Sequence, residues 1–296
     1  MKIFLFGPSS SLGIAYKKAA KRRNYTVYSI HNILESSQAT EHPESVTVDF
    51  SDPSAIQKLI LSEWPDVIVN GLKSMNTADE KEMVTINVNL PTYLAQISHH
   101  LSARYIQLSS TQIFDGFNDS PYRSTDKPIP TDFIGQTLLL GEKAVLNNNT
   151  LDPLILRIPE ILGNSTEKHT ENQSYNERLL TIAQSTEKVK LQKQRYIQPT
   201  SASNVADLLL ELSERRDLHG IFHWAGREVI DEYSFVKMIL SNAKISNPED
   251  RIEILSEEKQ NFSIELSPLR EKVKTKALSI PELFDDFNYI EPLYVD

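Results

Sequence analysis

The chain has 296 residues, of which 40% are hydrophobic and 24% are charged. This balance is typical of a soluble globular protein with one large α/β unit or two domains, and it excludes disorder and collagen-like repeats. Because the chain has no cysteine, disulfides, thiolate nucleophiles and cysteine metal sites are excluded as well. The net charge of −9 argues against nucleic-acid binding, which needs clustered Lys and Arg.

The first residues do not resemble a targeting signal. Residues 1–7 form a strand-like run that leads directly into a loop, without a basic start or a long apolar stretch. No segment reaches the roughly 18 apolar residues that a membrane span needs. We therefore expect a cytoplasmic protein that does not contact membranes.

Short runs rich in β-branched and aromatic residues predict seven strands. In chain order they are 2–6, 25–30, 46–50, 66–70, 104–109, 153–157 and 221–224. Several are apolar for four residues in succession, which is typical of parallel strands that helices cover on both faces.

Helical spacing alternates with these strands. It predicts helices over 54–63, 82–101 and 137–147, with Pro53 and Pro91 close to helix starts, where a missing N–H costs little. This alternation predicts the α/β class, with a Rossmann-type doubly wound parallel sheet.

Two polar segments fall outside the alternating pattern. Residues 164–194 are polar and lack glycine, and the segment after Arg227 has helical and loop character without strand rhythm. We assign both to a smaller, substrate-type lobe over the carboxyl edge of the sheet. The predicted domains are a Rossmann-type NAD(P)-binding-like unit (1–160 and 196–226) and a smaller substrate-binding-like lobe (161–195 and 227–296).

The loop after the first strand reads Gly7-Pro8-Ser9-Ser10-Ser11-Leu12-Gly13. A dinucleotide-binding fold needs a tight turn here, so that backbone N–H groups and the helix N-terminus meet the pyrophosphate. Ser10 stands where the fingerprint has its middle glycine. We expect its Cβ to crowd the turn, with left-handed geometry costing about 1 kcal/mol. The alternative is that Gly7 and Gly13 serve only chain reversal and helix packing.

The ends of the second and third strands would contact the adenosine half of a cofactor. An acidic residue at the end of the second strand suits NAD and an Arg suits NADP, but the chain has His31 and Asn32 there. Asp49 at the end of the third strand can still face an adenine edge. The candidate cofactor-binding residues are Gly7, Ser10, Ser11, Leu12, Gly13, Asp49 and Phe50.

A set of motifs from Ser109 to Gly163 carries a resemblance to a known family. The motifs are Phe114-Asp115-Gly116, Pro121-Tyr122-Arg123, Gly141-Glu142-Lys143-Ala144-Val145 and Leu156-Arg157-Ile158-Pro159. They resemble extended short-chain dehydrogenase/reductases of the dTDP-4-dehydrorhamnose reductase type, and more closely still the regulatory β subunits of methionine adenosyltransferase. The resemblance covers about three quarters of the chain, and the tail after Arg251 lacks the family's usual Arg-Pro pair.

The resemblance implies where catalytic residues would stand. The family's reductases use a Ser or Thr after the fifth strand, and a Tyr and a Lys four residues apart on one helix face. The cation lowers the pKa of the phenol, which then exchanges a proton with the substrate. Aligned through Gly135 and Gly141, the Tyr position is Ile134 and the Lys position is Leu138, whereas Ser110 is retained. An aliphatic pair at this spacing is typical of helix packing.

Three functional hypotheses follow from the resemblance. The first is a catalytically silent regulatory or scaffolding subunit, whose partner by resemblance is the catalytic subunit of methionine adenosyltransferase. The second is an NADPH-dependent sugar-nucleotide reductase with an unrecognised proton donor, and the third is a module that senses a nucleotide or nucleotide sugar. The missing Tyr and Lys favour the first. We expect NADP to bind weakly or not at all, and no metal site, because the histidines lack an acidic partner pattern.

Overall fold

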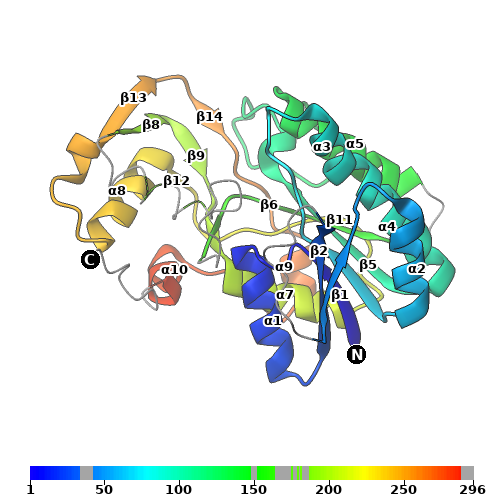
Figure 1. Ribbon diagram of the computed structural model, residues 1–296. Coiled ribbons are helices and arrows are strands. Elements are labelled where there is room, and N and C mark those ends of the chain that lie inside the picture. Colours follow the sequence, from blue (N-terminus) through cyan, green and yellow to red (C-terminus); the bar gives the residue numbers. More distant parts are fainter. Residues whose placement is uncertain are drawn as a thin grey trace.

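The computed structural model describes residues 1–33, 43–147, 152–163, 175, 179, 181 and 187–287. Its larger unit has a seven-stranded parallel sheet in the order β11-β6-β5-β4-β1-β2-β3 (Figure 1). The strand order reverses between β1 and β4, and ligands bind at such a switch point in open α/β sheets. The predicted Rossmann-type doubly wound fold is confirmed.

All seven predicted strands are present, with bounds within two residues of the prediction. They are β1 (Lys2–Phe6), β2 (Thr26–Asn32), β3 (Ser45–Val48), β4 (Val67–Asn70), β5 (Arg104–Ser110), β6 (Leu154–Ile158) and β11 (Gly220–His223).

Helices cover both faces of this sheet. One face carries α1 (Ser11–Arg22) and α7 (Ala202–Glu214), and the other carries α2 (Pro53–Glu63), α4 (Leu90–Leu101) and α5 (Phe133–Asn147). Side chains of a strand alternate between the faces. Accordingly, Ile3 and Leu5 lie in the core cluster with α1 and α7, whereas Phe4 lies in the opposite cluster.

The single helix predicted over 82–101 is three elements. They are α3 (Glu80–Val84), a π-helical turn (Thr85–Asn89) and α4. Gly141 of α5 packs on the π-helical turn so closely that a Cβ would lie 2.0 Å from the carbonyl oxygen of Asn87. The Asn87 amide also donates to the Thr137 hydroxyl at 3.0 Å. The turn therefore marks a contact between helices, which propensity does not encode.

The smaller lobe contains strands that the sequence did not predict. They are β8 (Val189–Gln192), β9 (Arg195–Ile197), β12 (Ile230–Asp231), β13 (Ile252–Ser256) and β14 (Gln260–Asn261), beside α8 (Glu232–Asn242). The expectation that the chain after Arg227 lacks strands is wrong. β13 pairs with β8, which lies far away in sequence. No local hairpin pattern therefore predicts either strand. A further pair, β7 (Ile161–Leu162) and β10 (Thr200–Ser201), joins the lobe to the larger unit.

The C-terminal part of the chain belongs to both units. Ile264, Leu266 and Leu269, the last at the start of α9 (Leu269–Lys272), lie in the core cluster of α1 and α7. The assignment of 227–296 to the smaller lobe stays a prediction. Further on, α10 (Ile280–Phe287) returns to the lobe core through Leu283.

Candidate functional site

The turn between β1 and α1 lies at the switch point of the sheet. Gly7 has a φ of +87°, which L side chains rarely adopt, and a Cβ there would lie 3.2 Å from the backbone carbon of Gly71. At Gly13 a Cβ would lie only 2.2 Å from the carbonyl oxygen of Gly7. Both glycines are therefore required by the turn itself.

Ser10 caps α1. It has φ −64° and ψ 158°, so the left-handed strain expected at this position is absent and that part of the prediction is wrong. Its hydroxyl accepts from the backbone N–H of Gly13 at 3.1 Å and donates to the carbonyl of Gly7 at 2.9 Å. The side chain thus takes a helix N-terminal N–H that a phosphate would otherwise use.

The two residues after Ser10 are buried. Ser11 is 8% exposed, and a Cβ built on Gly163 would lie 2.8 Å from the Cβ of Ser11. Leu12 belongs to the core cluster of α1 and α7. The side chain of Leu12 is therefore part of the hydrophobic core.

The residues proposed for the adenosine half of a cofactor have protein partners. Phe50 is buried, with its ring 5.7 Å from that of Phe6. The carboxylate of Asp49 accepts from the hydroxyl and the backbone N–H of Ser51 at 2.7 and 2.8 Å, and these bonds lower its pKa. At the end of β2, Asn32 is 8% exposed.

Ser110 ends β5 and caps the short 3₁₀ helix that follows. Its hydroxyl accepts from the backbone N–H of Gln112 at 3.3 Å, and its side chain is 4% exposed. Thr111, the next residue, is buried as well. A capping serine with so little exposure has a structural role.

Ile134 and Leu138 lie on the inner face of α5. Leu138 is 5% exposed and belongs to the core cluster of α1 and α7, and Ile134 packs against the same cluster while partly exposed. These are the two positions at which the resemblance expects a phenol and an ammonium group.

Tyr122, from the motif Pro121-Tyr122-Arg123, belongs to the same core cluster as Leu138. The hydroxyl of Tyr122 donates to Asp115 at 2.6 Å, and its ring stacks on Phe114 with centroids 4.1 Å apart. Burial and the neighbouring carboxylate of Asp115 raise the pKa of Tyr122 to about 12. The motif residues Phe114, Asp115 and Tyr122 thus contact one another, which their spacing alone did not indicate.

His223, at the end of β11, is buried in the same region. Burial and the neighbouring Arg157 cation lower its pKa to about 4. One ring nitrogen lies 3.1 Å from the carbonyl oxygen of Tyr122. At neutral pH the ring is uncharged and cannot supply an acid.

A small pocket opens between the carboxyl edge of the sheet and the smaller lobe. Its lining includes Thr111 on the sheet side and Tyr175, Arg195, Phe235 and Phe262 on the lobe side. The Tyr175 hydroxyl donates to Glu232 at 2.7 Å, and Arg195 donates to the same carboxylate oxygen at 2.7 Å. Burial, followed by the Glu232 charge, raises the pKa of Tyr175 well above its usual value.

Neither a metal site nor a membrane helix is found in the described part of the chain. Among these residues, no group of three His, Asp or Glu side chains could hold a metal ion. Within the same ranges, no helix is both long enough and apolar enough to span a membrane.

The parallel sheet, the glycine turn after β1 and the lobe over the carboxyl edge define a protein of the Rossmann-type α/β class. The family model described as the RmlD substrate binding domain matches residues 1–271, so the chain belongs to the RmlD substrate binding domain family.

Two named relatives differ in activity. Methionine adenosyltransferase 2 subunit beta from Bos taurus is 28% identical over 242 residues, which cover 78% of this chain and 69% of that protein. The dTDP-4-dehydrorhamnose reductase from Escherichia coli K12 is 24% identical over 255 residues, which cover 82% of this chain and 79% of the enzyme.

Solved structures share the fold. A dTDP-4-dehydrorhamnose reductase from Bacillus anthracis in complex with NADP superposes with a TM-score of 0.77 at 16% identity, covering 97% of this chain and 98% of that one. The reductase from Clostridium acetobutylicum gives a TM-score of 0.76 at 19% identity, covering 97% and 100%. At these identities the likeness shows the fold alone.

Proposed function

We propose that this chain is a catalytically silent member of its family that acts as a regulatory or scaffolding subunit, with the methionine adenosyltransferase β subunit as its nearest model. The observation that carries the proposal is the burial of Leu138 in the core, with Ile134 packed beside it, where the resemblance expects Lys and Tyr. Loss of a general acid alone costs about 10²–10⁴-fold in rate.

Three ionisable residues in this region support catalytic silence, because none of the three is a suitable substitute for the missing acid. The Tyr122 hydroxyl is engaged by Asp115, and its pKa of about 12 makes it a weak acid at neutral pH. Tyr175 is bound to Glu232 and its pKa is also raised. His223 is 1% exposed and neutral.

Hydride transfer tests this proposal directly. With NADPH and dTDP-4-dehydrorhamnose, we expect no oxidation of NADPH above the protein-free rate, while the Escherichia coli reductase serves as the active control. Turnover that Ser110→Ala abolishes would show a working active site and would overturn the proposal.

The regulatory role needs a protein partner. The relative named methionine adenosyltransferase 2 subunit beta supports a catalytic subunit of that enzyme as the partner. We expect this catalytic subunit to co-purify with the chain from its native cell and to be identified by mass spectrometry. Recovery of the chain without any stable protein partner would contradict the regulatory role.

The proposal extends to weak or absent NADP(H) binding. Ser10 supports it because its hydroxyl occupies the N–H of Gly13 at the start of α1. Calorimetry should detect no binding at micromolar NADPH, and Ser10→Gly should bind more tightly than Ser9→Gly. Exchanging a cap for Gly costs only a few tenths of a kcal/mol, so both variants should fold. Micromolar or tighter binding by the unaltered chain would refute this extension.

A further inference from the structure

The segment that precedes α10 is tied to the larger unit. The Glu211 carboxylate on α7 accepts from the backbone N–H groups of Lys274 and Thr275 at 2.7 and 2.9 Å, and from the Thr275 hydroxyl at 2.8 Å. The Asn204 amide donates to the carbonyl of Lys276 at 2.8 Å. The chain therefore reaches α10 from a fixed point on the sheet unit.

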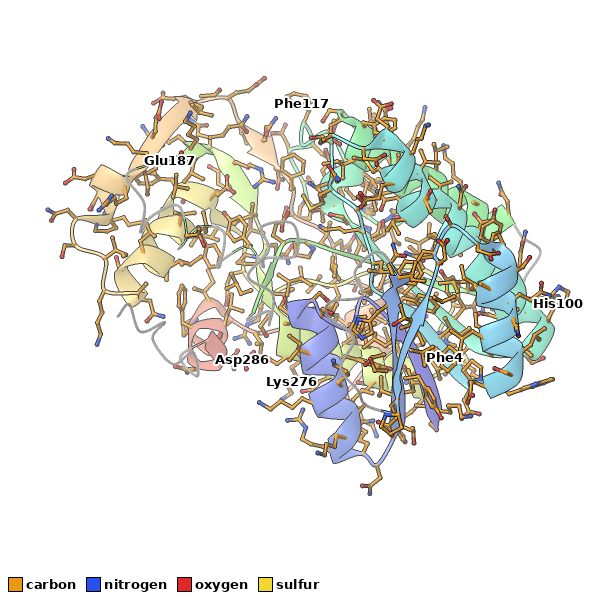
Figure 2. The ribbon with its side chains drawn as sticks, in the orientation of Figure 1. Phe4, His100, Phe117, Glu187, Lys276 and Asp286 are labelled. Atoms are coloured by element: carbon orange, nitrogen blue, oxygen red, sulfur yellow. The ribbon has the colours of Figure 1, made fainter. Side chains whose placement is uncertain are left out.

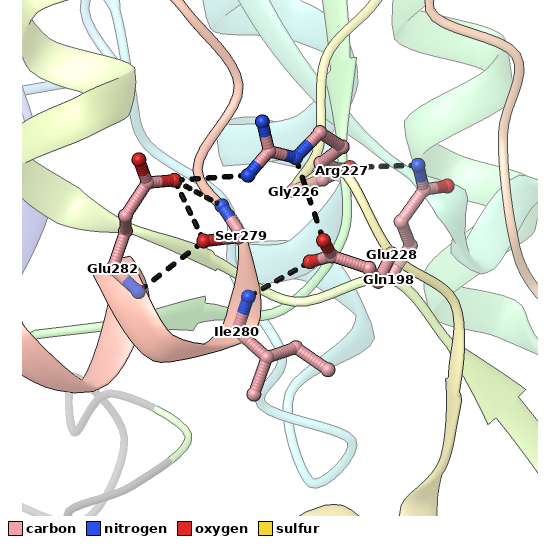
Figure 3. A network of polar contacts seen from close by, with 7 residues as sticks. All are labelled: Gln198, Gly226, Arg227, Glu228, Ser279, Ile280 and Glu282. Atoms are coloured by element: carbon pink, nitrogen blue, oxygen red, sulfur yellow. Dashed lines mark hydrogen bonds and ion pairs between the residues drawn. The ribbon is translucent and has the colours of Figure 1, made fainter.

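A polar network fixes the start of α10, as Figure 3 shows. Arg227 contacts Glu282 at 3.3 Å and Glu228 at 3.4 Å. Glu228 accepts from the backbone N–H of Ile280 at 2.8 Å, and Glu282 accepts from the backbone N–H and the hydroxyl of Ser279, each at 2.7 Å. The loop after β11 thus determines where the helix begins.

One side of α10 packs on the smaller lobe. Leu283 is 1% exposed and lies in the lobe core, and the ring of Phe284 lies 6.0 Å from that of Phe235. Phe235 also lines the pocket between the lobe and the sheet edge. The same aromatic ring therefore contacts the helix and forms part of the pocket wall.

The other contact of α10 returns to the larger unit. The Asp286 carboxylate accepts from the Ser201 hydroxyl at 2.5 Å and from the Ser203 hydroxyl. Ser201 is the N-cap of α7, where a negative charge is favourable. In Figure 2, Asp286 lies on the side of α10 that faces the larger unit. The helix thus bridges the lobe core and the start of α7.

We propose that α10 is a clasp that holds the smaller lobe over the pocket, and that it detaches while the seven-stranded sheet stays folded. An isolated helix of eight residues is not stable in water, so docking through Leu283 and Asp286 decides whether α10 is formed. Such small units open with less free energy than the whole fold. When α10 detaches, Phe235 loses its contact with Phe284, and the pocket that Phe235 lines opens.

The absence of cysteine makes thiol labelling a specific test, because a single introduced cysteine is the only reactive thiol. Thr111→Cys places it in the pocket, and the reaction with Ellman's reagent reports opening. Asp286→Ala should raise this rate roughly tenfold, as expected for losing a hydrogen bond to a charged group. Asp285→Ala, which removes the same charge from the same helix, should leave it unchanged. If Thr111→Cys disturbs folding, Ile197→Cys places the reporter thiol at another position in the lining of the same pocket.

A second reporter separates clasp opening from unfolding. Val69→Cys lies in the middle of the sheet, where Val69 is fully buried, and Asp286→Ala should not change its labelling rate. Equal labelling rates of the pocket cysteine in the Asp286→Ala and Asp285→Ala backgrounds would overturn the proposal. So would a labelling rate of Val69→Cys that rises together with that of the pocket cysteine. Because the assay measures neither activity nor partner binding, its outcome is independent of the proposed regulatory role.

Discussion

Glu142 and Arg157 form a buried, bidentate ion pair between α5 and β6. Arg157 donates from Nη2 to Glu142 Oε2 at 2.7 Å and from Nε to Oε1 at 3.0 Å, and both side chains are 2% exposed. The guanidinium also lies 5.5 Å from the ring of Phe114. Because α5 carries Ile134 and Leu138, this pair sets the position of the helix face on which the proposed catalytic silence depends.

Removing one partner of this pair should be strongly destabilising. Glu142→Ala leaves a buried Arg157 charge uncompensated, which typically costs about 3–5 kcal/mol. Urea denaturation followed by circular dichroism gives the free energy of unfolding. The matched control is Asp207→Ala, which breaks an exposed pair with Arg22 and should cost about 0–1 kcal/mol. Similar losses in the two variants would mean that burial does not govern the Glu142 contact.

The buried His223 should make stability depend on pH in mildly acidic solution. Its pKa is about 4 in the folded chain, against 6.5 for an ordinary histidine, so the unfolded chain binds more protons between these values. The His223 contribution is complete above about pH 6.5 and falls with decreasing pH, by up to about 1.4 kcal/mol per pH unit.

Comparing variants isolates this contribution from that of the carboxylates. The free energy of unfolding, measured from pH 7 to pH 5, should fall less steeply for His223→Gln than for the unaltered chain. His219→Gln, at an exposed histidine, should keep the original slope. An unchanged slope in His223→Gln would show that the ring binds protons equally in the folded and unfolded chains, which contradicts a lowered pKa.

The sheet was predictable because its strands have a clear sequence pattern. Val67–Asn70 and Leu154–Ile158 are fully buried, and such strands read as continuous apolar runs. The lobe strands are two to five residues long and pair with distant segments, as β8 does with β13. Their existence depends on tertiary contacts that no local pattern carries.

The roles of the candidate site residues stay predictions, whereas their local geometry can be compared with the sequence. The alignment located Ile134 and Leu138, whose packing in the core agrees with the aliphatic pattern. The glycine fingerprint does not indicate the conformation of Ser10, because a serine directly before a helix is a favoured N-cap. A capping motif at the start of the helix was the signal that could have found it.

The two glycine positions 13 and 220 should respond differently to alanine. At Gly13 the new Cβ would lie 2.2 Å from a backbone oxygen, so the turn after β1 must move. At Gly220 the φ is +88° but nothing lies within 4 Å of the Cβ position. We expect Gly220→Ala to cost about 1–2 kcal/mol from backbone strain alone, and Gly13→Ala to cost more. Thermal unfolding orders the variants, and a larger loss in Gly220→Ala would contradict the close packing of this turn.

The inner face of α5 should reject the lysine that the family's reductases carry. Leu138 is 5% exposed in the core, so Leu138→Lys must bury an ammonium group or push the helix outward, and an uncompensated buried charge costs several kcal/mol. Leu140→Lys is the matched control, because Leu140 lies on the same helix with 52% exposure and should change stability by no more than about 0.5 kcal/mol. Urea denaturation of both variants measures the difference. If Leu138→Lys were as stable as Leu140→Lys, the position would still tolerate the catalytic residue, and the structural argument for silence would lose its support.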